Sequence, residues 1–167
     1  MWFGYPSNLG FLLTLIQARS DIFHKTILNL VTDATGIQMF RSTGIEAALA
    51  MRVNFEPWSP AKLVEVAGNS DVCIIPSDLN SAKSAASSNR LITALALGLP
   101  TAAEVLPSYS EFKRYFADIR TDEFSDVVRE PALLHDRIVE AQTSVVTAFN
   151  TQAMSDEWVR IFRLYDA

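Results

Sequence analysis

The sequence contains a single cysteine, Cys73, and it has few cations for its length. One cysteine excludes an internal disulfide and fits a reducing compartment, so the cytoplasm is the expected location. Lys and Arg number 14 against 19 Asp and Glu, which gives a formal net charge of -5. This acidic balance disfavours extended contacts with nucleic acid or an anionic membrane, so any bound anion must be held locally.

Motifs that define several common α/β functions are also missing. The sequence has no G-x-x-x-x-G-K-[ST], no G-x-G-x-x-G and no G-x-S-x-G, which excludes the P-loop, the dinucleotide fingerprint and the nucleophile elbow. His24 and His135 are far apart, and no set of Cys, Asp or Glu accompanies them at metal-ligand spacing, so no metal site is expected. The apolar stretch 11–18 is too short to span a bilayer.

Segments with strand character alternate with segments of helical periodicity, which is typical of a doubly wound parallel sheet. With 167 residues, of which 49% are hydrophobic, the chain is expected to form one Rossmann-like α/β domain over residues 1–167, with helices flanking the sheet and a C-terminal helical segment. Residues 34–50 lack a clean period, and a long loop bordering a site is the alternative to a helix there. Strands are expected at 1–5, 25–33, 51–58, 71–77 and 99–105, and helices at 6–20, 59–70, 87–98 and from about 122 onward.

The stretch 83–100 begins with small polar residues and two cations, turns apolar, and ends on glycine and proline. A helix that begins near Ser87 exposes unpaired N–H groups and a partial positive charge, which can hold a diphosphate without a metal. The preceding strand delivers this loop to the carboxyl edge of the sheet, where open α/β sheets bind ligands. A plain helix capped by Ser87 or Ser88, with a solvated Arg90, is the alternative. The polar residues expected at the diphosphate are Lys83, Ser87, Ser88, Asn89 and Arg90.

Two longer segments, FEPWSPAKLVEVAGNSDVCIIPSD (55–78) and KSAASSNRLITALALGLPTAAEVLPSY (83–109), carry a family resemblance. They resemble the C-terminal, donor-binding domain of glycosyltransferases with the GT-B architecture, of the group 1-like kind. The opening WFGYPSNLGFLLTLI (2–16) is similar to the glycine turn and helix that begin this domain. The late EWVRIFRLYD (157–166) is similar to its closing helix, so the likeness covers nearly all of the chain.

The resemblance implies that a nucleotide-diphospho-sugar lies along the carboxyl edge of the sheet as co-substrate, with no metal and no other cofactor. Its diphosphate would contact the helix that begins near Ser87, and its base the EPWSP loop. For Trp58 a core aromatic is the alternative role, and for Gly4 a tight turn without a ligand. The residues expected near the nucleotide or sugar are Gly4, Asn8, Pro57, Trp58, Ser77 and Thr93.

The sequence departs from the family pattern at two places. Thr93 stands where many retaining members carry the second of two glutamates, and Asn8 alone follows the first strand where an Arg and Lys pair is frequent. Donor identity and the stereochemistry of transfer therefore stay open. A nucleotide-sugar epimerase half, a non-catalytic nucleotide-binding or interaction module, and a receiver-like domain built on Asp33 are the alternative functions.

The resemblance also implies a preceding acceptor-binding domain that carries the catalytic residues, with a glycan or lipid-linked acceptor. The chain alone is then expected to bind a donor and not to transfer its sugar, and any peripheral membrane association would come through that domain. Its closing helix would return toward the preceding domain, so self-association through an exposed apolar stripe is expected. The stripe consists of Trp158, Ile161, Phe162 and Tyr165.

Overall fold

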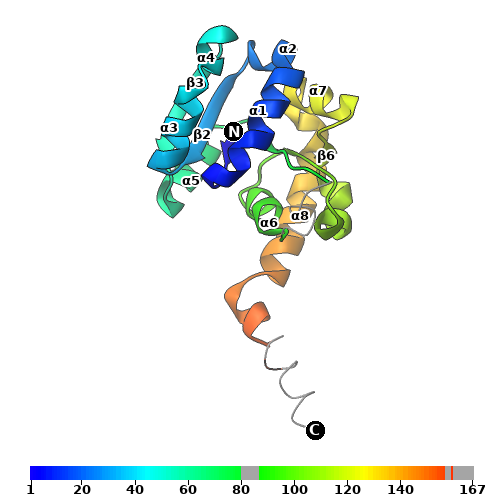
Figure 1. The fold of residues 1–167 in the computed structure, drawn as a ribbon. Coiled ribbons are helices and arrows are strands. Elements are labelled where there is room, and N and C mark those ends of the chain that lie inside the picture. The colour runs from blue at the N-terminus through cyan, green and yellow to red at the C-terminus, as the bar shows by residue number, and fades with distance from the viewer. Residues whose placement is uncertain (80–86, 157–158, 160–167) are drawn as a thin grey trace.

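The computed structural model describes residues 1–79, 87–156 and 159, and its centre is a parallel β-sheet (Figure 1). Strands pair in the orders β1-β2-β3 and β4-β5-β6, and every pairing is parallel. The Ile74 N–H donates to the Met1 carbonyl at 2.9 Å, and the Met1 amino group donates to the Val72 carbonyl. These bonds join the two halves in the order β3-β2-β1-β4-β5-β6, which confirms the doubly wound, Rossmann-like fold. The strands are β1 (Trp2–Phe3), β2 (Ile27–Thr32), β3 (Arg52–Pro57), β4 (Cys73–Ile75), β5 (Thr101–Ala103) and β6 (Ala117–Asp118).

Helices connect the strands and flank the sheet, and α8 runs from the globular body toward the C-terminus (Figure 1). Every predicted strand and helix of the described chain is present, and the unperiodic stretch 34–50 forms two helices broken at Gly44, whose φ is +65°. The helices are α1 (Leu9–Ala18), α2 (Ser20–Phe23), α3 (Ala34–Ser42), α4 (Ile45–Ala48), α5 (Pro60–Ala67), α6 (Asn89–Ala96), α7 (Asp122–Arg129) and α8 (His135–Ala148). Short 3-10 segments are η1 (Pro6–Asn8), η3 (Pro107–Tyr115) and η4 (Pro131–Leu134).

Local signals account for the ends of two important helices. Ser59 precedes Pro60 at the start of α5, and its Oγ accepts the Lys62 N–H at 3.1 Å, as the sequence predicts for a capped helix. After α6 the chain turns at Gly98, whose φ is +76°. There the Gln142 amide of α8 donates to the Ala96 carbonyl at 3.1 Å. The last turn of α6 is therefore tied to α8.

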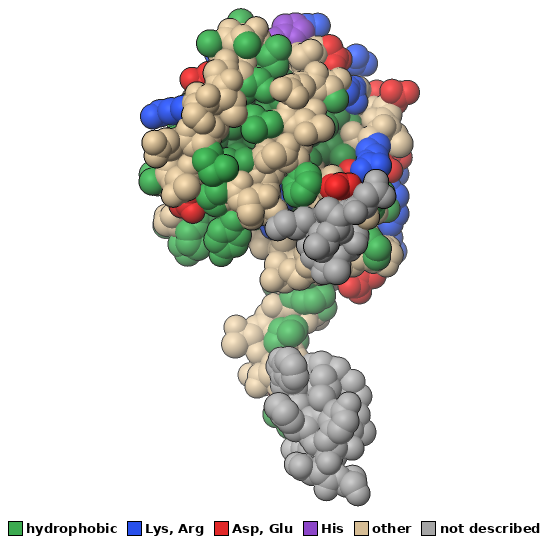
Figure 2. Space-filling model, viewed as in Figure 1, with side chains coloured by type: hydrophobic (Ala, Val, Ile, Leu, Met, Phe, Trp, Pro, Cys, Tyr) green, Lys and Arg blue, Asp and Glu red, His purple; other side chains and the backbone are tan. Residues whose placement is uncertain are grey.

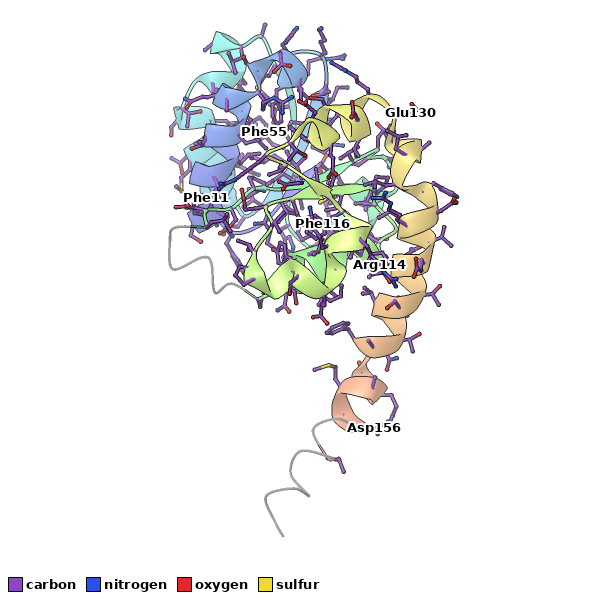
Figure 3. The ribbon with its side chains drawn as sticks, turned by 90° about the vertical axis from the view of Figure 1, so that its right-hand side faces the viewer. Phe11, Phe55, Arg114, Phe116, Glu130 and Asp156 are labelled. Carbon is purple, nitrogen blue, oxygen red and sulfur yellow. The ribbon has the colours of Figure 1, made fainter. Side chains whose placement is uncertain are left out.

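The described apolar residues form one buried cluster on both faces of the sheet. Strands β4 and β5 are buried along their whole length, as expected for parallel strands covered by helices. On the side of α3, the rings of Phe40 and Phe55 meet edge to face at a centroid distance of 5.8 Å, and Phe55 lies within the layered body in Figure 3. Arg114 lies beside α8 in the same view and pairs with Glu140 at 2.5 Å. Among the described helices, none has the length and apolar character that a bilayer span requires.

Two features of the fold were not predicted. The strand β6 has only two residues, too few for an alternating pattern, and the long 3-10 segment η3 mixes charged and aromatic residues without a helical period. The stripe Trp158, Ile161, Phe162 and Tyr165 lies outside the described residues. The expectation that it drives self-association therefore stays a prediction.

The junction of β2 and α3 contains a contact that only glycine allows. The Asp33 side chain accepts the Gly36 N–H at 2.8 Å and starts α3. A Cβ on Gly36 would lie 2.5 Å from the Thr32 Oγ1 and 2.7 Å from its Cγ2. Because Thr32 is completely buried and its hydroxyl donates to the Gly4 carbonyl at 2.7 Å, it has no room to move.

We therefore expect Gly36→Ala to lower the free energy of unfolding by about 1 to 3 kcal/mol, the usual cost of overpacking. Gly10→Ala is the matched control, since nothing lies within 4 Å of its added Cβ in α1. There the substitution should be neutral or stabilise by up to about 1 kcal/mol. Urea unfolding of both variants measures the difference, and equal stabilities would contradict the close contact.

Candidate anion-binding site

The reversal of strand order between β1 and β4 brings three polypeptide segments to the carboxyl edge of the sheet. Gly4 follows β1 and donates its N–H to the Val31 carbonyl of β2 at 3.2 Å. Ser77 follows β4, and α6 begins at Asn89. In doubly wound sheets this switch point is the usual place for a ligand.

The guanidinium of Arg90 is buried at this switch point. Arg90 as a whole is half-buried, whereas its Nε and Nη2 atoms are inaccessible and have no hydrogen-bond partner in the described chain. Its Cζ lies 5.4 Å from the ring centre of Trp2 and 5.8 Å from that of Phe3. These aromatic faces attract a cation but offer no acceptor to its N–H groups.

Neighbouring groups do not neutralise this cation. Burial lowers the pKa of Arg90, and the nearby Cys73 and Tyr109 act in the opposite direction. Burial also raises the pKa of the Cys73 thiol to about 11 and raises the pKa of Tyr109. Because both groups are then uncharged at neutral pH, Arg90 carries a charge that neither of them balances.

Gly4 allows the other groups to approach Arg90 closely. A Cβ on Gly4 would lie 3.1 Å from the Trp2 Cζ2 and 3.4 Å from the Arg90 Cζ. Four buried side-chain N or O atoms of the described chain have no partner, and three of them are Trp2 Nε1, Arg90 Nε and Arg90 Nη2. All three are donors, so the group that would satisfy them is an acceptor, and the positive charge favours an anion.

Within the described residues, the N-cap position of α6 also makes no side-chain capping bond. Ser88 is the N-cap residue by position, but its hydroxyl makes no capping hydrogen bond, and no acidic residue lies in the first turn. The alternative was a plain helix capped by Ser87 or Ser88 beside a solvated Arg90. Ser88 does not make the capping bond, and the Nε and Nη2 atoms of Arg90 are not in contact with solvent. An uncapped helix start next to a buried cation strengthens the local positive potential.

The other predicted site residues differ in their exposure and in their hydrogen bonds. Ser87 and Asn89 are exposed at the start of α6, and Ser77 is half-buried after β4. The Thr93 hydroxyl donates to the Asn89 carbonyl at 2.7 Å, so its proton is used inside the helix. Asn8 is half-buried at the end of η1, and its side chain does not cap α1. Lys83 lies outside the described residues.

At the end of β3, Trp58 is 54% exposed beside the exposed Pro57, so the alternative of a core aromatic is wrong. The Trp58 N–H donates to the Thr32 carbonyl at 2.9 Å, and the Thr32 hydroxyl donates to the Gly4 carbonyl. Thr32 thus fixes the end of β3 relative to the end of β1. Gly4 does not have a positive φ, and its backbone lies close to the side chains of Trp2 and Arg90.

Four residues at this edge were not predicted: Trp2, Tyr5, Thr32 and Tyr109. Trp2 and Tyr109 were part of an ordinary apolar pattern, and nothing local in the sequence shows that both lie at Arg90. Tyr5 is 77% exposed directly after Gly4. An aromatic residue directly after a glycine at the end of a strand could have indicated a ligand contact. Thr32 is a polar residue at the end of an apolar strand, which was a second such indication.

A hollow of about 510 Å³ lies elsewhere, at the amino edge of the sheet. It is lined by residues such as Thr26, Arg52 and Asp71 and by none of the predicted site residues. None of the buried side-chain atoms that lack a partner in the described chain belongs to a residue that lines this hollow, whereas two of them belong to Arg90. Within the described residues, no group of three or more His, Cys, Asp or Glu could hold a metal ion.

The unpaired charge leads to a prediction about stability. In buffer without phosphate, we expect Arg90→Met to keep or raise the free energy of unfolding, because a buried cation with unmet N–H groups is costly. Leu91→Ala removes a fully buried neighbour in the same helix and should lower it by about 2 to 5 kcal/mol. If urea unfolding shows Arg90→Met to be as damaging as Leu91→Ala, Arg90 has partners in the free protein.

No protein-family model matches the chain, and no curated protein sequence matches it. A function is therefore argued from the residues at the switch point and their geometry.

Proposed function

We propose that the chain is the donor-binding domain of a glycosyltransferase and holds the diphosphate of a nucleotide-diphospho-sugar at Arg90 and the start of α6. The observation that carries the proposal is the buried Arg90 guanidinium, whose Nε and Nη2 have no hydrogen-bond acceptor among the residues that the structure describes. Because these two atoms are enclosed in the free protein, a phosphate group would have to displace neighbouring side chains to reach them. Once bound, its oxygens would restore the hydrogen bonds lost on burial and balance the charge.

A diphosphate suits this position better than a single carboxylate. It offers several oxygens, and the site offers several separate donors, namely the guanidinium, the Trp2 indole and the N–H groups of the uncapped first turn of α6. In sugar transfer the bond between the anomeric carbon and the diphosphate oxygen breaks, and that oxygen takes the electron pair. Arg90 and the α6 terminus would stabilise the negative charge that develops there, without a metal ion.

Trp58 is a suitable contact for the nucleoside end of the donor. Parallel strands are about 4.8 Å apart, so the ends of β1 and β3, separated by β2, lie about 10 Å from each other. That span corresponds to a ribose and base extending from a diphosphate at Gly4. The half-exposed indole of Trp58 can stack on the base, with Pro57 beside it.

The acceptor side of the reaction belongs to the proposal as well. The acceptor, a glycan or a lipid-linked sugar, and the base that activates it would be supplied by a preceding domain, in the cytoplasm. The chain alone would then bind the donor without transferring its sugar. Donor binding with no transfer even beside an acceptor domain would favour a non-catalytic nucleotide-binding module.

Calorimetric titration with UDP, GDP, dTDP and ADP tests the diphosphate site. At least one should bind, and Arg90→Met should weaken that binding by about 1.5 to 3 kcal/mol, the range for hydrogen bonds to charged groups. Arg114→Met is the control, because Arg114 is 66% exposed and pairs with Glu140 on α8. Equal nucleotide affinity of Arg90→Met and the unsubstituted protein would remove Arg90 from the site.

A separate titration tests the role of Trp58. Trp58→Ala should weaken nucleotide binding by about 1 to 3 kcal/mol, the range for stacking of a base on an aromatic side chain. Trp58→Phe should retain most of the affinity, since it keeps an aromatic face. Inorganic pyrophosphate, which has no base, should bind all three proteins alike. A matching loss of pyrophosphate affinity in Trp58→Ala would show that Trp58 acts on the phosphate end instead.

A further inference from the structure

Strand β3 forms one edge of the sheet, and its outer side has no backbone partner in the described chain. The Trp58 N–H points to β2, where it donates to the Thr32 carbonyl. Because backbone groups alternate along a strand, Val53, Phe55 and Pro57 direct their backbone groups outward. Pro57 has no N–H to leave unpaired there, whereas Val53 and Phe55 offer two N–H and two carbonyl groups.

The side chains of β3 are self-complementary when the strand is read in reverse. Arg52, Asn54 and Glu56 alternate on one face, and Val53 and Phe55 on the other. If two copies of this strand run antiparallel and are centred on Asn54, each Arg52 faces Glu56 of the other copy. On the opposite face, each Val53 then faces Phe55. The paired side chains are therefore oppositely charged on one face and apolar on the other.

We infer that β3 pairs antiparallel with β3 of a second copy of the chain, so that the two sheets become continuous. In this register Val53 and Phe55 of opposite copies are hydrogen-bonded pairs, which gives four backbone bonds across the two-fold axis. Arg52 and Glu56 are non-hydrogen-bonded pairs, in which opposite side chains approach most closely. The register centred on Asn54 therefore satisfies both the outward backbone groups and the side-chain pairs.

The neighbours of these residues leave them available. Arg52 and Asn54 are exposed, and the Glu56 side chain is 31% exposed. Lys62 lies 3.8 Å from Glu56, but it lies 2.7 Å from Glu65, which is its closer partner. Asn54 donates one amide N–H to Asn29 at 2.8 Å, and its carbonyl oxygen can accept from Asn54 of the second copy.

Charged side chains at an edge strand can also serve to prevent pairing. The order of the charges along the strand distinguishes the two cases. An edge that prevents pairing places like charges opposite each other, whereas antiparallel pairing of β3 places Arg52 opposite Glu56. Figure 2 shows Lys and Arg as well as Asp and Glu around the rim of the face that it draws. This inference does not rest on the proposed donor site, which lies along the carboxyl edge of the sheet from Arg90 to Trp58, whereas the pairing uses the outer side of β3.

Sedimentation velocity of the 167-residue chain over a range of concentrations tests the pairing. The unsubstituted protein should form a dimer, and Arg52→Glu and Glu56→Arg should each shift the monomer–dimer midpoint about tenfold or more upward, because each places like charges in opposition twice. A mixture of the two variants restores both opposite-charge pairs and should recover dimerisation as a heterodimer. Arg137→Glu, an exposed position on α8, should leave the midpoint unchanged.

Val53→Pro provides a second test that does not depend on charge. It removes an outward N–H while leaving the bonds between β3 and β2 intact, so the folded monomer should persist and the dimer should be lost. Circular dichroism of each variant establishes that it is folded. A monomeric unsubstituted protein at all concentrations, a dimer unaffected by the single charge variants, or a mixture no more associated than its components would overturn the inference.

Discussion

The unbalanced positive charge of Arg90 is the constraint on which the carboxyl edge of this protein depends. A guanidinium normally remains in water or pairs with a carboxylate, but here its Nε and Nη2 are enclosed, and no acceptor in the described part of the chain reaches them. The surrounding structure provides aromatic faces from β1, a glycine that leaves room, and the open start of a helix. Each of these features would make the binding of an anion beside Arg90 more favourable. None of them supplies the negative charge that Arg90 lacks.

The ends of the three strands β1, β2 and β3 are held in place by one buried residue, Thr32. Thr32 accepts the Trp58 N–H at its carbonyl and donates its hydroxyl to the Gly4 carbonyl. Its methyl and hydroxyl groups in turn determine that only glycine fits at position 36. The distance between Gly4 and Trp58 is therefore set by core packing, and such preorganisation would reduce the entropy cost of binding the proposed donor.

Much of the fold could be predicted from the sequence, because its signals are local. The apolar runs of β2 and β4, and the Ser-Pro start of α5, are each explained by neighbouring residues, and the structure contains them. The state of Arg90 could not be predicted in this way. Its burial depends on Trp2 and Phe3, which are far away in the sequence, and on the short β1 strand that brings them beside α6. Likewise, neither the exposure of Trp58 nor the lack of a Ser88 cap follows from residue type, since both depend on where the chain turns.

The amide of Gln142 donates to the Ala96 carbonyl, so α8 is attached to the carboxyl end of the same helix whose amino end lies at Arg90. Helix α6 has eight residues, and at 1.5 Å per residue it is about 12 Å long. A short helix of this kind moves as a rigid rod, because its internal hydrogen bonds resist bending. A displacement of α8 would therefore shift the carboxyl end of α6, and the rigid helix would carry that shift to its amino end beside Arg90.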